Sequence, residues 1–169
     1  LLDGGLSKKE FEEITSKIKV GDYVNYAPTA VQNLETDPTK TGYTKQVLST
    51  DTTAKWRILN IDSETGKIMI TTDGYVNKVT IRGATGYLYG ANELNRLCES
   101  LYSNTEKGIT ARSMTIEDLD KACGYIPSSD LLRYAWYPAD TADSDLKDVV
   151  AGGHTYTAKK HTASLAGEV

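Results

Sequence analysis

Three segments of the chain space their apolar residues as amphipathic helices do. In the first, over residues 8–18, the apolar stripe consists of Phe11, Ile14 and Ile18. Ser7 and Glu10 have the spacing of a capping box, in which each side chain accepts a hydrogen bond from an amide at the helix start. Leu6 is expected to pack on Phe11 as a hydrophobic staple. We expect this helix either to pack on its own domain or to form a short charged stalk.

The second and third helices are predicted at 91–102 and 115–123. The apolar stripe of the second consists of Leu94, Leu97, Cys98 and Leu101. The stripe of the third consists of Ile116, Leu119 and Cys123. Thr115 and Asp118 have capping-box spacing, and Gly124 is a typical helix terminator. Both stripes are expected to face the same core, because a domain of this length has one.

Alternating apolar and polar residues predict strands at 19–26, 55–61, 67–72 and 78–82. The second and third of these are expected to form a β-hairpin, because the sequence DSETG between them supplies turn residues and a glycine. Trp56 and Ile58 lie on one face of the hairpin, so we expect the Trp56 side chain in the core.

Other stretches show no lasting period. Residues 27–53 are rich in Thr, Pro and Asp, and we expect a long loop or a loosely paired hairpin there. Gly83, Gly86 and Gly90 are expected to interrupt regular structure before the second helix. Beyond Pro138 the chain is rich in Asp, Ala, Thr and Gly, which predicts an irregular tail.

Together these elements predict an α+β fold, with a small antiparallel β-sheet, two helices packed against it and an N-terminal helix. We place the N-terminal helix or stalk at 1–18, the α+β domain at 19–137 and the irregular C-terminal tail at 138–169. A chain of 169 residues is long enough for one domain with a sizeable core and too short for two ordinary domains.

Charge and hydropathy exclude two classes of partner. The formal net charge is −4 and no basic block stands out, so we expect no binding to nucleic acid. No apolar run approaches the roughly 18 residues of a membrane span. We therefore expect attachment to a membrane only through a segment not present in this chain. The chain begins Leu1-Leu2 without a Met, so we expect a chain that is processed, excised or incompletely recorded.

The balance of aromatic residues favours β-sheets whose faces are partly exposed to solvent. Eleven tyrosines stand against a single phenylalanine, and threonine is abundant. Tyrosine suits positions where the ring is buried and the hydroxyl stays in water, and both residue types favour strands. This composition is typical of extracellular surfaces.

The residues that carry acid, base or metal chemistry give little support for catalysis. His154 and His161 are the two histidines, and two ligands do not define a metal site, so we expect both to be solvated. Glu117, Asp118 and Asp120 are expected to cap the third helix and complement its dipole rather than to form a catalytic pair. We therefore predict that the protein is not an enzyme and has no cofactor and no metal.

Three further groups of side chains are candidates for roles in the fold or in binding. Arg112 is expected to pair with a nearby acid. Cys98 and Cys123 lack C-x-x-C spacing, and they either form one structural disulfide or are both reduced and buried. The side chains that would form an aromatic binding surface are Tyr87, Tyr89 and Trp136.

Four stretches also carry a family resemblance: residues 20–26 (VGDYVNY), 55–59 (KWRIL), 92–104 (NELNRLCESLYSN) and 111–118 (ARSMTIED). In this order they resemble a large group of surface-associated and phage-associated proteins of Gram-positive gut bacteria. Some members follow a pilin-type or membrane-anchor N-terminus. Many continue into a C-type-lectin-like part with a Tyr-Trp-Leu-Ala-Ser-Arg type motif, which this chain lacks. The resemblance covers about residues 19–125.

The resemblance and the composition together predict a non-enzymatic structural module of a Gram-positive bacterium, which is either displayed at the surface or forms filaments. Its expected partners are copies of itself or other surface or virion proteins. One alternative is a fibre or decoration protein of a phage virion. Another is a glycan-binding or small-molecule-binding module that uses exposed Tyr and Trp side chains. Burial of the stripe on residues 8–18 between copies would favour assembly, and an aromatic groove would favour binding.

Overall fold

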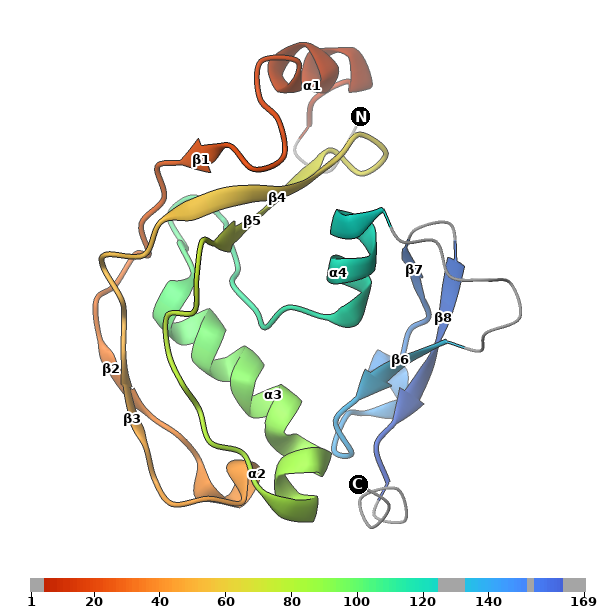
Figure 1. The fold of residues 1–169 in the computed structure, drawn as a ribbon. Helices are drawn as coiled ribbons and strands as arrows, with labels where there is room; N and C mark the ends of the chain where they lie inside the picture. Colours follow the sequence, from red (N-terminus) through yellow and green to blue (C-terminus); the bar gives the residue numbers. More distant parts are fainter. Residues whose placement is uncertain (1–4, 125–132, 152–153, 163–169) are drawn as a thin grey trace. The chain divides into compact units, whose positions relative to one another are not determined.

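A computed structural model describes residues 5–124, 133–151 and 154–162 (Figure 1). The chain divides into two compact units whose sequences are interleaved. The first unit comprises residues 1–27 and 51–76, and the second comprises residues 28–50 and 77–169. The boundaries predicted at 18/19 and 137/138 do not coincide with this division. The helix at the start of the chain belongs to the same unit as the hairpin predicted at 55–72.

The first unit contains helix α1 (Lys8–Thr15) and a three-stranded antiparallel sheet of order β1-β4-β5. Its strands are β1 (Tyr23–Val24), β4 (Trp56–Asp62) and β5 (Lys67–Thr72). The predicted hairpin is therefore confirmed. In its turn, Asp62 Oδ1 accepts hydrogen bonds from the amides of Glu64 and Thr65 at 3.0 and 3.2 Å, and Gly66 has a φ of 74°.

One face of this sheet is buried in the predicted alternation. Trp56 and Ile58 both point into the core, and the Tyr26 ring packs edge-on against Trp56 with the centroids 4.6 Å apart. The prediction that Trp56 is a core residue is confirmed. On the opposite face Arg57 forms an ion pair with Asp73, with Nε and Oδ1 2.9 Å apart.

Helix α1 has the predicted start but a different buried face. The Ser7–Glu10 capping box is present, with both reciprocal hydrogen bonds. The helix ends at Thr15, whose hydroxyl donates to the Phe11 carbonyl at 2.8 Å. Phe11 and Thr15 are therefore the buried pair, and Ile14 is 54% exposed. The predicted stripe is wrong after its first member, because the helix is too short to carry Ile18 on the same face.

The second unit begins with a short hairpin that holds a helical turn between its strands. The elements are β2 (Asn33–Glu35), α2 (Pro38–Thr41) and β3 (Val47–Ser49). This is the loosely paired hairpin that was one of two expectations for residues 27–53. Asp37 caps α2, because its Oδ1 accepts from the Thr39 amide at 2.8 Å, and Gly42 ends the turn with a φ of 65°.

The strand predicted at 78–82 does not form. The side-chain amide of Gln46 instead bonds both backbone groups of Thr80, accepting from its N–H at 2.8 Å and donating to its carbonyl at 3.1 Å. Asn77 likewise donates to the Ser49 carbonyl at 3.1 Å. This extended segment is held by side chains, and so it makes no strand ladder with its neighbours.

Helix α3 (Gly83–Tyr102) starts eight residues before the predicted helix and packs on α2 and β2. The expectation that Gly83, Gly86 and Gly90 interrupt regular structure is wrong, because all three lie inside the helix. A Cβ at Gly90 would lie 3.1 Å from two side-chain carbons of Ile81, and one at Gly86 would clash with Ile81 and come within 2.9 Å of the Thr41 carbonyl. These glycines let α3 approach the preceding chain closely.

Helix α4 (Ile116–Cys123) also keeps its predicted ends and reverses its predicted faces. Thr115 and Asp118 form the capping box, and Gly124 terminates the helix with a φ of 64°. The predicted apolar stripe is wrong, since Ile116 is 55% exposed and Leu119 and Cys123 are also exposed. The buried side chains are instead acidic, and they are Glu117 and Asp120.

The described part of residues 138–169 is not an irregular tail. It contains the short 3₁₀ helix η1 (Asp143–Asp145) and strands β7 (Val149–Ala151) and β8 (His154–Lys160). With β6 (Tyr134–Tyr137) they form a sheet of order β6-β8-β7, in which β6 is parallel to β8 and β7 is antiparallel to it. Strand β8 could not be predicted from the sequence, because Tyr156 is its one fully buried residue and it therefore shows no alternation of apolar residues.

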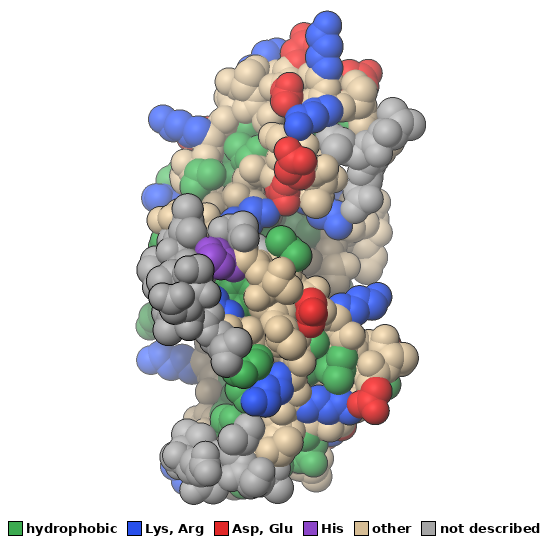
Figure 2. Space-filling model, turned by 90° about the vertical axis from the view of Figure 1, so that its right-hand side faces the viewer, with side chains coloured by type: hydrophobic (Ala, Val, Ile, Leu, Met, Phe, Trp, Pro, Cys, Tyr) green, Lys and Arg blue, Asp and Glu red, His purple; other side chains and the backbone are tan. Residues whose placement is uncertain are grey.

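The α+β class is confirmed by this mixture of helices and mainly antiparallel sheets. On the face shown in Figure 2, hydrophobic side chains occur in small groups among basic and acidic ones. Within the described ranges, the structure contains no helix whose length and hydropathy would let it cross a membrane.

Candidate functional site

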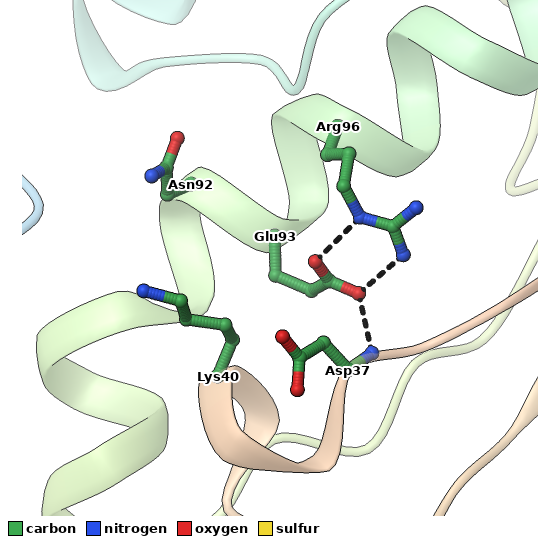
Figure 3. A pocket seen from close by; sticks show the side chains of 5 residues that line it. All are labelled: Asp37, Lys40, Asn92, Glu93 and Arg96. Atoms are coloured by element: carbon green, nitrogen blue, oxygen red, sulfur yellow. Dashed lines mark hydrogen bonds and ion pairs between the residues drawn. The ribbon is translucent and has the colours of Figure 1, made fainter.

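A small depression in the second unit is lined by charged residues from α2 and α3 (Figure 3). Its volume is about 250 Å³. The lining residues are Asp37, Lys40, Asn92, Glu93 and Arg96. Figure 3 shows Glu93 between Arg96 and the backbone of Asp37, with Lys40 extending toward Asn92.

The charges in this depression are engaged with one another. Glu93 is 3% exposed, and its carboxylate accepts from Arg96 Nε and Nη2, each at 2.8 Å, and from the Asp37 amide at 2.7 Å. Arg96 also donates to the Glu35 carbonyl at 2.7 Å. Hydrogen bonding to Glu93 raises the pKa of Arg96. This network joins α2 to α3, and we interpret it as structural.

A second candidate site lies on one face of the C-terminal sheet. Parallel pairing places Tyr134 opposite Thr157 and Trp136 opposite Lys159, so these four side chains share a face. His161 follows Lys159 by two residues and stacks on Trp136, with centroids 5.1 Å apart and an interplanar angle of 13°.

Helix α3 adds one more ring to this row. The Tyr87 ring meets His161 edge-on at 4.3 Å, and Tyr134 meets Trp136 edge-on at 5.6 Å. We call the set of Tyr87, Tyr134, Trp136, Lys159 and His161 the aromatic face. Trp136 is 39% exposed, so part of this residue is open to solvent.

A single lysine provides the charge of the aromatic face. The Lys159 ammonium lies 4.4 Å from the Tyr134 ring centroid and 5.2 Å from that of Trp136. Both positions are within the range of a cation–π interaction. Among the described residues Lys159 has no carboxylate partner, whereas the adjacent Lys160, on the opposite face, pairs with Asp143.

His161 is less solvated than the sequence analysis expected. Its Nδ1 is buried and has no hydrogen-bond partner among the residues that the structure describes. Burial lowers the pKa of this imidazole, so it is neutral at pH 7. The expectation of a solvated histidine is therefore wrong for His161, because its ring stacks on Trp136 and meets the Tyr87 ring edge-on.

The opposite face of the same sheet is held by a buried polar cluster. The Tyr156 hydroxyl donates to Asp120 Oδ2 at 2.5 Å, and Arg133 Nη1 donates to the same oxygen at 2.8 Å. Burial, together with the hydrogen bond to Asp120, raises the pKa of Tyr156. Since Asp120 belongs to α4, this cluster ties the helix to the sheet.

The structure brings together two of the three predicted aromatic residues. Tyr87 and Trp136 both contact His161. Tyr89 lies apart from them, because it is two residues from Tyr87 on a helix, and its ring lies 4.6 Å from the Lys40 ammonium. Sequence reasoning missed Tyr134, Lys159 and His161, although the alternation of YAWY over 134–137 was a signal for the first of them.

The remaining candidates have structural roles or stand alone. Cys98 is half-buried, with its pKa raised by desolvation, and Cys123 is exposed; both are free thiols. The disulfide that the sequence left open is not formed here, and the alternative of two buried thiols fails for Cys123. Arg112 pairs as expected with an acid, donating to both carboxylate oxygens of Asp118 at 2.6 and 2.8 Å.

The predicted acidic cluster is divided between two tasks. Asp118 caps α4, as expected. Asp120 bonds Tyr156 and Arg133, which the sequence did not indicate. No group of three His, Cys, Asp or Glu side chains in the described part of the chain is arranged to hold a metal ion.

No family model, curated protein or solved structure matches this chain. The aromatic face is therefore the feature on which a functional hypothesis rests.

Proposed function

We propose that this protein is a non-enzymatic binding module that holds a carbohydrate on its aromatic face. The observation that carries the proposal is the row of rings formed by Tyr134, Trp136, His161 and Tyr87, with Trp136 39% exposed. Aromatic side chains provide a flat apolar surface next to polar groups, and the C–H face of a sugar ring fits such a surface.

The rigidity of the row supports a role in binding. Tyr134, Trp136 and Lys159 stand on two hydrogen-bonded strands. The backbone amide of His161 donates to the Tyr137 carbonyl at 2.9 Å, and its ring packs on Trp136 and Tyr87. Preorganised side chains lose little conformational freedom when a ligand binds. On its opposite face the sheet is held to helix α4 by the hydrogen bond from Tyr156 to Asp120.

Polar groups around the rings complete a surface suited to sugar hydroxyls. Thr155 and Thr157 are exposed on β8, on the same face as Lys159. Their hydroxyls can donate and accept hydrogen bonds. The combination of flat rings and neutral hydroxyls suits carbohydrate better than a purely apolar ligand.

The geometry favours this function over assembly through the N-terminal stripe. That hypothesis needs Phe11 available to a second copy, and Phe11 is buried within its own chain. We propose display at the surface of a Gram-positive bacterium, which is supported by the family resemblance of residues 19–125 and by the tyrosine and threonine content.

Binding is tested by tryptophan fluorescence with a panel of oligosaccharides. The chain has two tryptophans, of which Trp56 is buried in the first unit and Trp136 lies on the aromatic face. In a Trp56→Phe background, a bound sugar is expected to shift and enhance the remaining emission. Trp136→Ala should abolish binding measured by calorimetry. The matched control is Tyr75→Ala, which removes an aromatic ring that is 81% exposed and outside the face.

Retention of full affinity by Trp136→Ala, or an equal loss in both variants, would overturn the proposed site. Absence of binding to any sugar of the panel by the unmodified protein would overturn the proposed function.

A further inference from the structure

We infer that the carbohydrate held on the aromatic face carries a carboxylate, as a uronic acid does, and that Lys159 binds it. This inference rests on the proposed function and specifies its ligand class. The feature behind it is a lysine that lies beside two rings and, among the described residues, has no acidic partner.

Several other cations of the second unit form ion pairs, although Arg82 lies over the Tyr43 ring, 4.4 Å from its centroid, much as Lys159 lies beside its two rings. Each of several lysines and arginines is paired with a carboxylate within the unit. The pairs are Lys40–Asp140, Lys45–Glu35, Arg96–Glu93, Arg112–Asp118, Arg133–Asp120 and Lys160–Asp143. Lys159 instead lies against Tyr134 and Trp136, which leaves its charge available to a ligand on those rings.

The acidic residue next to strand β7 already has a hydrogen-bond partner. Asp148 directly precedes β7, and its Oδ1 accepts from the Ala158 amide at 2.8 Å. The side chains on the same face of β7 and β8 are neutral, with Val150 paired to Thr155. An anionic group above Lys159 therefore meets one positive charge and, among the described residues of these two strands, uncharged neighbours.

A single cation beside two rings favours a ligand with one negative charge over a polyanion. A polyanion such as a nucleic acid needs several cations that neutralise successive phosphates, and the aromatic face offers a single one. A sugar ring with one carboxylate places its apolar side on Trp136 and its charge within reach of Lys159.

The test compares uronic-acid oligosaccharides with their carboxyl-reduced counterparts by titration calorimetry. The probes are oligomers of glucuronate, galacturonate and mannuronate, each beside the matched neutral oligomer. The unmodified protein is expected to bind at least one acidic oligomer about tenfold more tightly than its neutral form, the usual size of a charge-assisted hydrogen bond. That preference should shrink as salt is added.

Adjacent lysines provide the matched variants. Lys159→Gln and Lys160→Gln change the net charge equally, and the two side chains lie on opposite faces of β8. Lys159→Gln should remove the preference, so that acidic and neutral oligomers bind with equal affinity, while Lys160→Gln should keep the preference of the unmodified protein.

Each result has a distinct meaning. Equal binding of acidic and neutral oligomers by the unmodified protein would overturn the carboxylate inference and leave carbohydrate binding intact. Equal loss in both lysine variants would show a general charge effect and would also overturn the role of Lys159. Failure to bind either kind of oligomer, in a protein whose circular dichroism shows it to be folded, would count against the proposed function itself.

Discussion

Helices α1 and α4 are alike in sequence design and opposite in what they bury. Each has eight residues, begins at a capping box and carries an isoleucine that is more than half exposed. Helix α1 buries Phe11 and Thr15, and α4 buries Glu117 and Asp120. The start of a helix is thus fixed by a few local residues, whereas its buried face depends on what the rest of the chain presents to it.

The partner residues explain the difference. Asp120 is buried because Tyr156 and Arg133 both donate to it, and an acid in such a place requires these donors. The carboxylate and its two donors come from segments up to 36 residues apart in the sequence. No period within residues 116–123 encodes that requirement. Substitutions on each helix can separate the two kinds of buried face.

Asp120→Ala should produce the largest loss. It leaves Arg133 and the Tyr156 hydroxyl without the buried carboxylate that both bond, and breaking such a pair typically costs about 3–5 kcal/mol. Urea unfolding followed by circular dichroism measures the loss. Leu119→Ala is the control on the exposed face of the same helix and should change stability by less than about 0.5 kcal/mol. A larger effect at Leu119 than at Asp120 would contradict the assignment of the buried face.

Phe11→Ala should cost about 3 kcal/mol, because it removes the buried aromatic ring of α1. Its neighbour Ile14, 54% exposed, should tolerate the same change with little loss. Amide hydrogen exchange over residues 8–15 reports the opening of this helix. Equal protection in both variants would mean that Phe11 does not hold α1 in place.

Ser7→Ala and Thr115→Ala should have similar, smaller effects of about 1 kcal/mol each, since each removes the side chain that accepts from an amide in the first turn. The two caps test the part of the comparison in which the helices agree. Helix content and unfolding midpoints of both variants should fall together. An unchanged unfolding midpoint for one variant would show that its capping hydrogen bond does not stabilise the fold.

Acid should weaken both caps gradually. Hydrogen bonds from Ser7 lower the pKa of Glu10 below its ordinary value of 4.5. For Asp118, desolvation raises the pKa, but hydrogen bonds from Arg112 and Thr115 outweigh it and lower the pKa below 3.8. A carboxylate with a lowered folded-state pKa stabilises the fold above its unfolded pKa, and this stabilisation is lost as the pH falls through the folded value. Side-chain carboxyl shifts in an NMR titration should show both midpoints below these values. Midpoints at or above them would contradict the hydrogen bonds.

The sequence predicts well what depends on neighbours along the chain. Capping boxes at Ser7 and Thr115, the stop at Gly124 and the hairpin around Gly66 all follow from residues within five positions of one another. Trp56 is also predicted as core, because alternation within one strand defines its face.

The sequence fails where distant segments decide the outcome. Gly86 and Gly90 look like helix breakers until Ile81 is seen against them. The strand expected at 78–82 is replaced by the amide of Gln46, a residue more than thirty positions away from Thr80. In the candidate site, the sequence predicts Tyr87 and Trp136. His161 joins them only because β6 pairs in parallel with β8, whose paired residues lie 23 positions further along the chain.

The interleaving of the two units has a consequence for synthesis on the ribosome. Chain segments emerge in sequence order, at roughly 5–20 residues per second. The β2–β3 hairpin of the second unit is complete at residue 49, but helix α3, on which it packs, ends at Tyr102. During the seconds between, the first unit receives its last strand, while Leu48, buried in the finished protein, has no helix to cover it. A nascent chain halted just after residue 76 thus carries the strands β1, β4 and β5 of the first unit. Between β1 and β4 in the sequence it carries a β2–β3 hairpin of the second unit that still lacks α3 and offers its apolar side chain and open strand edges to chaperones.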